Sequence, residues 1–105
     1  MRVVVTGAGG FVGRHLIRHL LADRHEVIPI VRTELGLFNE RVIADIGSAD
    51  WQPLLVGADA VVHLAARVHI MHDGANDPLA EFRRVNVYGT RILAEAASRS
   101  GVRRF

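Results

Sequence analysis

The sequence predicts an α/β fold in which a doubly wound parallel sheet of four strands, in the order 3-2-1-4, carries helices on both faces. Three observations support this prediction. Short β-branched segments alternate with amphipathic helical ones, the strands are apolar enough to be buried on both sides, and a glycine-rich turn joins the first strand to the first helix. Since 105 residues are about the size of one small domain, we expect residues 1–105 to form a single domain.

The first half of the chain contains two predicted strands and the helix between them. The first strand is expected at Val3–Val5, a β-branched run that ends at the glycine-rich turn. A helix follows over Phe11–Ala22, where apolar residues recur at helical spacing with arginines and histidines opposite. The second strand is expected at Val27–Val31. Because its Pro29 has no N–H to donate, a third strand can pair with it only beyond this proline.

The second half of the chain adds two strands and two helices. The strands are expected at Arg41–Ala44 and Asp59–Ala65, with a short helix over Ala49–Val56 between them and Ser48 as its N-cap. The last helix is predicted from Pro78 to Arg99, since proline suits a first helical turn. Its inward stripe consists of Leu79, Phe82, Asn86, Gly89, Leu93 and Ala97.

The composition excludes several classes of function. Half of the residues are hydrophobic and 23% are charged, which is typical of folded globular proteins. All 13 basic residues are arginines, so a pI near 10.4 accompanies a formal charge of only +2. They are scattered without interleaved aromatics, and we expect no nucleic-acid partner. The chain has no cysteine, and its first apolar run is too short for a signal peptide or a membrane span. We therefore expect a cytoplasmic protein without a membrane partner.

Three glycines at spacing three, Gly7, Gly10 and Gly13, lie between the first strand and the first helix. In this context Gly7 permits a sharp turn, Gly10 lets backbone approach a pyrophosphate, and Gly13 lets the helix lie close to the sheet. The helix N-terminus then offers free N–H groups and a positive dipole end to an anion. The motif predicts a Rossmann-type domain that binds NAD or NADP.

Two further positions bear on the nucleotide. At 32 − 13 = 19 residues past the last glycine, where an acidic residue would bind the ribose hydroxyls of NAD, the chain has Arg32, which favours the 2′-phosphate of NADP. A solvated arginine at a strand end is the alternative. Asp45 and Ile46 follow the third strand, where adenine is expected. Asp45 either accepts a hydrogen bond from the adenine amino group or simply ends the strand.

Five histidines and one asparagine are candidate site residues. His15 and His19 share a helix face without a third ligand, and His69, His72 and Asp73 lie together in a loop; we expect no metal site at either place. His63 is interpreted as a hydrogen-bonded core residue instead of a catalytic base. Asn86 is either a backbone tie or part of an active-site network.

Four segments together resemble the extended short-chain dehydrogenase/reductases, which are nucleotide-sugar epimerases, dehydratases and 4-keto reductases. The segments are TGAGGFVG at 6–13, the aspartate at 45, VVHLAA at 61–66 and NVYGT at 86–90. DPLAEFRRVN at 77–86 looks most like the UDP-sugar 4-epimerase and 4-reductase branch. The resemblance implies a set of cofactor-binding residues, namely Gly7, Gly10, Phe11, Val12 and Gly13 at the pyrophosphate, Asp45 and Ile46 at the adenine, and Leu64, Ala65 and Ala66 at the nicotinamide ribose, with Asn86 ordering the site.

The family's catalytic tyrosine and lysine are not found in these residues. Tyr88 is the only tyrosine, the residue four positions later is Ile92, and there is no lysine. We therefore assign no catalytic residue and expect a truncated enzyme that ends before the fifth strand. The expected function is the NAD(P)-binding portion of a nucleotide-sugar epimerase, dehydratase or reductase, inactive alone. The alternative is a non-catalytic NAD(P)-sensing module. An open edge on the fourth strand would favour self-association.

Overall fold

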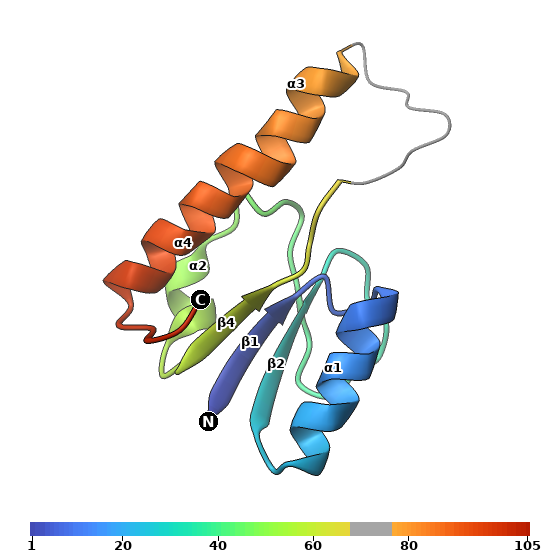
Figure 1. Cartoon of the computed structure of the whole chain (residues 1–105), viewed down its shortest axis with the longest axis vertical. Coiled ribbons are helices and arrows are strands. Elements are labelled where there is room, and N and C mark those ends of the chain that lie inside the picture. Colours follow the sequence, from blue (N-terminus) through green and yellow to red (C-terminus); the bar gives the residue numbers. More distant parts are fainter. Residues whose placement is uncertain (68–76) are drawn as a thin grey trace.

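A single parallel sheet forms the centre of the computed structural model, which describes residues 1–67 and 77–105 (Figure 1). The four strands lie in the order β3-β2-β1-β4, as predicted. His69, His72 and Asp73 lie outside the described residues. The strands are β1 (Arg2–Thr6), β2 (Glu26–Val31), β3 (Arg41–Val42) and β4 (Ala60–His63).

The helices follow the strands as expected, with one departure. Helix α1 (Phe11–Ala22) has the predicted bounds. The last predicted helix is one continuous helical rod in Figure 1, but it comprises α3 (Pro78–Arg83), the π-helix η1 (Arg84–Gly89) and α4 (Thr90–Arg99). Helix α2 (Trp51–Leu55) precedes β4. Among residues 1–67 and 77–105, every helix is too short or too polar to span a bilayer.

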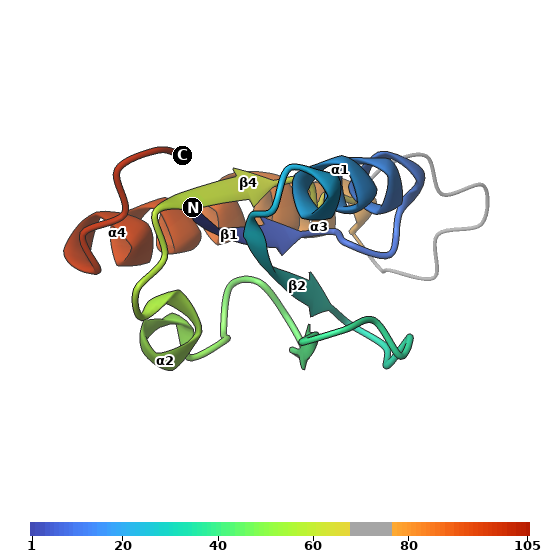
Figure 2. The ribbon, with the colours of Figure 1, turned by 90° about the horizontal axis from the view of Figure 1, so that it is seen from below.

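The sheet separates two apolar layers, because alternate strand residues point to opposite faces. Val3 and Val5 pack with Ile17 of α1 on one face, whereas Val4 packs with Leu55 of α2 and Leu93 of α4 on the other. Figures 1 and 2 show the same arrangement, with α1 and α2 on opposite sides of the strands. The predicted double layer is therefore confirmed.

Pro29 lies at a position of β2 where a backbone N–H would have no partner in β3. The carbonyl of Val31 accepts a hydrogen bond from Ile43, so Val31 faces the β3 side, and Pro29 two residues earlier faces the same side. Pairing between β2 and β3 begins only at Ile30 with Arg41. This confirms that the third strand pairs with the second beyond the proline.

Three boundaries differ from prediction by two residues. Strand β4 ends at His63 and not at Ala65. Strand β3 ends at Val42 and not at Ala44. Its partner β2 itself ends at Val31, whose carbonyl accepts the last hydrogen bond, from the Ile43 N–H at 2.8 Å. Helix α2 begins after Asp50 and not after Ser48, and no side chain caps it. The prediction of an inward position is also wrong for Leu79, whose side chain is 59% exposed. Its turn of α3 extends beyond the ends of the strands (Figure 1).

The outer edge of β4 is also less open than expected. The N–H of Val61 donates to the Arg104 carbonyl at 2.9 Å, and the N–H of Arg103 donates to the Asp59 carbonyl at 3.1 Å. A bridge pairs Ala60 with Arg104 in the parallel sense. The last residues of the chain therefore cover the beginning of this edge.

Candidate functional site

A pocket of about 560 Å³ lies at the carboxyl ends of the strands. The loops after all four strands contribute to its wall, and α3 and η1 close one side. Open parallel sheets bind ligands at this edge, where the strand order reverses. Seven of the predicted site residues line the pocket: Gly7, Gly10, Arg32, Asp45, Ile46, Ala65 and Ala66.

The glycine turn has the geometry that its spacing predicts. Gly7 has φ +65°, and a Cβ there would lie 2.7 Å from the Ala65 nitrogen. A Cβ on Gly13 would lie 2.4 Å from the Gly7 carbonyl oxygen. Gly13 therefore lets the helix lie against the turn that leaves β1. A Cβ on Gly10 would meet only the Gly7 oxygen, at 3.4 Å.

The N-terminus of α1 begins at this turn without a side-chain cap. The first N–H groups of a helix have no intrahelical partner, so they are available to a ligand. The loop before them is held by the Gly10 N–H, which donates to the Gly7 carbonyl at 3.1 Å, and by Arg14, whose Nε donates to the Gly9 carbonyl at 2.9 Å. Phe11 and Val12 do not line the pocket, and their side chains are exposed. Only their backbone N–H groups remain as candidates for contact with a ligand.

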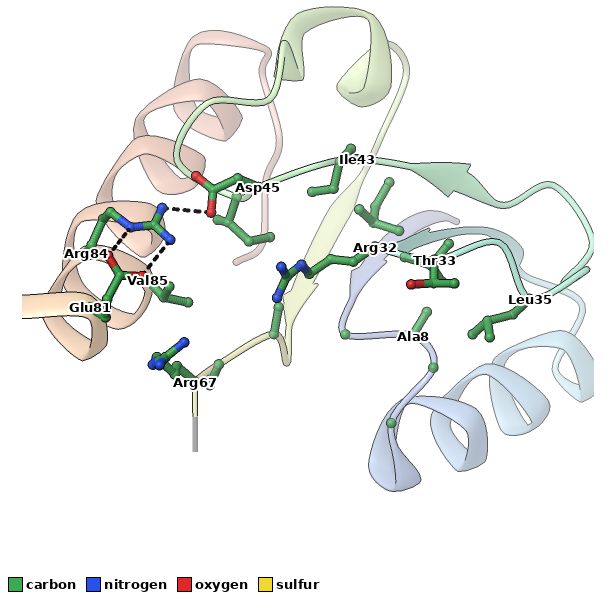
Figure 3. Close-up of a pocket in the computed structure, with 18 residues that line it drawn as sticks. Ala8, Arg32, Thr33, Leu35, Ile43, Asp45, Arg67, Glu81, Arg84 and Val85 are labelled. Carbon is green, nitrogen blue, oxygen red and sulfur yellow. Dashed lines mark hydrogen bonds and ion pairs between the residues drawn. The ribbon is translucent and has the colours of Figure 1, made fainter. Parts of the chain in front are cut away.

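A charged group not foreseen from the sequence crosses one end of the pocket. Arg84 donates to Asp45 Oδ1 at 2.8 Å and to Glu81 Oε2 at 3.1 Å (Figure 3). The N–H of Gly47 donates to the other oxygen, Asp45 Oδ2, at 3.2 Å. The hydrogen bond from Arg84 holds the pKa of Asp45 below its ordinary value. Asp45 is therefore an ionised carboxylate bound on both oxygens, and it does more than end a strand.

The sequence carried one signal for this group. Glu81 and Arg84 are three residues apart on a predicted helix, a spacing that places them on one face. Their partner Asp45 is 39 residues away, which helix periodicity does not show. Arg32 lies on the opposite side and extends into the pocket beside Thr33 (Figure 3).

The wall after β4 is held by the hydroxyl of Thr6, which is fully buried. Thr6 Oγ1 accepts hydrogen bonds from the N–H groups of Leu64 at 3.0 Å and Ala65 at 3.1 Å. Ala65 and Ala66 line the pocket, whereas Leu64 packs against the α1 layer and does not. Thr6 thus joins the end of β1 to the segment that forms the wall.

Asn86 holds the same wall from the helix side. Its Oδ1 accepts from the Arg67 N–H at 2.8 Å, and its Nδ2 donates to the Arg67 carbonyl at 2.9 Å. Because both ends of the amide are occupied and Asn86 does not line the pocket, it acts as the backbone tie. Its predicted place among the cofactor-binding residues is thus limited to holding the wall segment at Arg67. The π-helix around it was not predicted.

His63 is half-buried and hydrogen-bonded through both ring nitrogens. Nδ1 lies 2.6 Å from Thr6 Oγ1 and Nε2 lies 3.0 Å from Thr90 Oγ1. Burial lowers the pKa of His63. The interpretation of this residue as a hydrogen-bonded interior histidine agrees with these contacts.

Comparison with known proteins gives consistent matches. The sequence model of the NAD dependent epimerase/dehydratase family matches residues 3–105. A UDP-glucose 4-epimerase of Vibrio cholerae is 38% identical over 109 residues, which cover 98% of this chain and 33% of that protein. A 3-beta-hydroxysteroid dehydrogenase of Mycolicibacterium neoaurum is 36% identical over 113 residues, covering 99% of this chain and 30% of that protein. The chain thus spans about a third of the length of these relatives.

Two solved structures are similar throughout the chain. A short-chain dehydrogenase/reductase superfamily protein of Agrobacterium tumefaciens with bound NAD has a TM-score of 0.83 and 32% identity, covering 100% of this chain and 31% of that one. MoeE5 in complex with UDP-glucose and NAD has a TM-score of 0.80 and 33% identity, covering 97% of this chain and 34% of that one.

Proposed function

The chain belongs to the NAD-dependent epimerase/dehydratase family, and on this basis we propose that its pocket binds the dinucleotide NAD or NADP. The observation that carries the proposal is the junction of β1 and α1. A tight turn built on Gly7 and Gly13 leads into an uncapped helix N-terminus at the reversal point of the sheet. A diphosphate is the kind of anion that such a junction favours.

The pyrophosphate is proposed to lie beside Gly10 and the first turn of α1. The backbone N–H groups of Phe11 and Val12 are proposed as its donors. Gly10 supports this placement, since a Cβ there would meet no other atom closer than 3.4 Å and the residue faces the pocket. Gly7 and Gly13 are proposed to contribute only through their backbone, which forms the turn.

The adenine is proposed to lie between the loop after β2 and the loop after β3. Ile46 and Ile43 give this end of the pocket an apolar wall, and Asp45 gives it an acceptor. A carboxylate has about four lone-pair sites, of which Arg84 and Gly47 use two. Asp45 therefore keeps acceptor capacity for the adenine amino group.

Arg32 favours NADP as the nucleotide, because an exposed guanidinium at the end of β2 suits a ribose 2′-phosphate. NAD is the alternative, since both solved neighbours described above contain NAD. At the other end of the pocket, Ala65 and Ala66 are proposed to contact the nicotinamide ribose. Leu64 is proposed to contribute backbone only, and Asn86 to hold this segment in place.

For the whole protein we propose a nucleotide-sugar epimerase, dehydratase or 4-keto reductase. When bound, the nicotinamide ring accepts or donates hydride. The residues of this chain bind and orient the cofactor but supply no tyrosine–lysine pair for proton transfer, so the chain is proposed to be inactive by itself. A non-catalytic NAD(P)-sensing module is the second candidate, and the same missing pair favours it.

The test is titration of the chain with NADPH and with NADH, followed by the fluorescence of Trp51. Its buried indole donates to the Ile46 carbonyl at 2.9 Å, next to the proposed adenine site. Saturable binding of either nucleotide is expected, with tighter binding of NADPH. Binding of NADH tighter by about tenfold or more would overturn the role of Arg32, and no binding at millimolar concentration would overturn the site itself.

Substrate chemistry needs a separate measurement. The chain incubated with NAD and UDP-glucose is expected to show neither reduction of the nicotinamide nor formation of an epimer. Formation of either product would contradict the proposal that this chain is inactive by itself. To separate an enzyme from a sensor, the reading frame beyond Phe105 is examined for a serine-containing strand and a Tyr-x-x-x-Lys helix, which only the enzyme requires.

A further inference from the structure

We propose that His63 is a positioning residue of the pocket, held as a neutral imidazole with its proton on Nε2, and that protonation of this ring loosens the wall formed by residues 64–66. The inference about the ring stands on hydrogen-bond geometry alone. Its consequence for ligand affinity rests on the proposed dinucleotide site.

The contacts of Thr6 determine which ring nitrogen of His63 carries no proton. A hydroxyl oxygen has two lone pairs and one hydrogen. The N–H groups of Leu64 and Ala65 occupy both lone pairs of Thr6 Oγ1, at 3.0 and 3.1 Å. The remaining contact, with His63 Nδ1 at 2.6 Å, therefore uses the hydroxyl hydrogen. Nδ1 is the acceptor of this hydrogen bond and carries no proton.

The contacts of Thr90 lead independently to the same tautomer. Thr90 Oγ1 lies 2.8 Å from the Asn86 carbonyl oxygen, which can only accept, so the Thr90 hydroxyl hydrogen is used there. The contact between Thr90 Oγ1 and His63 Nε2, at 3.0 Å, then requires a proton on Nε2. The three hydrogen bonds therefore run in one direction. Thr6 donates to His63, His63 donates to Thr90, and Thr90 donates to the Asn86 carbonyl in the π-helix.

A second proton on the ring conflicts with this arrangement. It would place an N–H on Nδ1 opposite a Thr6 oxygen whose lone pairs are both in use. Relief requires Thr6 to release Leu64 or Ala65, and Ala65 lines the pocket. The charge on the ring is thereby coupled to the position of the pocket wall.

The contacts of His63 are with uncharged groups. They are the Thr6 hydroxyl of β1, the Thr90 hydroxyl of α4 and, at a ring-centroid distance of 6.2 Å, the Phe105 ring. Within residues 1–67 and 77–105, no carboxylate is hydrogen-bonded or ion-paired to His63. Burial lowers the pKa of the ring from its ordinary 6.5, which is consistent with the neutral form.

The first experiment is a long-range ¹H–¹⁵N correlation spectrum of the histidine rings of the unchanged chain near neutral pH. His63, assigned by its absence from the His63→Asn spectrum or by backbone-directed assignment, is expected as the Nε2–H tautomer. A ring protonated at Nδ1, or at both nitrogens, near neutral pH would overturn the inference. This readout needs neither ligand binding nor a foldable variant.

The second experiment is calorimetric titration with NAD between about pH 8 and about pH 5. NAD is used because a 2′-phosphate titrates near pH 6 and would add its own pH dependence. Affinity is expected to be constant above pH 6.5 and to weaken below the pKa of His63, reaching about tenfold for each further pH unit. Asp45, with its lowered pKa, does not titrate in this range.

Two variants make the comparison specific. His63→Asn keeps an acceptor for Thr6 but cannot be protonated, so we expect weaker binding near neutral pH and no acid-dependent loss. His19→Asn is the matched control, because His19 is exposed on α1, away from the pocket; it should retain the wild-type pH profile. An acid-dependent loss that persists in His63→Asn would refute the coupling. If the wild type binds no NAD at any pH, the proposed function fails, and the ring spectrum still decides the tautomer.

Discussion

A methyl group at Gly13 would collide with the backbone of the glycine turn, and Gly13→Ala should therefore destabilise the fold. The added Cβ would lie 2.4 Å from the Gly7 carbonyl oxygen and 2.9 Å from Ala8 Cα. Reaching an ordinary contact of 3.4 Å needs a shift of 3.4 − 2.4 = 1.0 Å between two backbone segments. Overpacking of this kind costs about 1–3 kcal/mol. Alanine returns up to about 1 kcal/mol of helix propensity. Because the atoms that the methyl group meets are backbone atoms, the upper part of the first range applies, about 2–3 kcal/mol, and the expected net loss is about 1–2 kcal/mol.

Thermal unfolding followed by far-UV circular dichroism measures this loss. For a domain of this size, 1 kcal/mol corresponds to about 4–8 °C in Tm, so Gly13→Ala should unfold several degrees below the wild type. Gly10→Ala is the matched control. Its Cβ would meet only one atom, at 3.4 Å, and it should unfold close to the wild type while binding nucleotide more weakly. A Gly13→Ala chain as stable as the wild type would refute the proposed close approach of helix and turn.

Three further outcomes are expected. Arg32→Asp should move the ratio of NADPH to NADH affinity toward NADH by at least about tenfold, about 1.4 kcal/mol, in the fluorescence titration; an unchanged ratio would mean that Arg32 is only solvated. Arg84→Leu should raise the pKa of Asp45, measured by carboxyl ¹³C NMR. Since the folded-state pKa of Asp45 is lowered, its stabilising contribution is present above its ordinary 3.8 and is lost as pH falls through the folded-state value. The stability difference between wild type and variant should therefore shrink in acid, and a constant difference would contradict the ion pair. The exposed apolar side chains of Val87 and Tyr88 should cause concentration-dependent association in light scattering, against which a monomer at all concentrations would count.

The strand order and the glycine turn were predictable because they depend on local patterns. The apolar period of α1 and the glycine spacing gave the helix its correct bounds. Pro29 even predicted where β3 begins to pair, since the loss of one N–H has the same effect in any parallel sheet. Such features require no knowledge of which distant residues meet.

The π-helix and the ion pair across the pocket were not predictable in this way. Helical periodicity locates a buried stripe but not the extra residue that widens one turn. The contacts around the π-helix come from elsewhere in the chain, as Asn86 binds the backbone of Arg67 and Gly89 allows close approach of Ile46. The ion pair of Asp45 was likewise not predictable, because its partner Arg84 follows 39 residues later in the chain.

The pocket wall after β4 owes its position to side chains and not to the sheet ladder, which ends at His63. Thr6 holds it from β1, and Asn86 holds it from the helix. Both ties, and the Asp45–Arg84 pair opposite them, lie within the residues described here. The ties that hold this wall are therefore supplied by the described residues themselves. On the proposed dinucleotide site, substitutions in the two ties should lower nucleotide affinity without any change in the residues that touch the ligand.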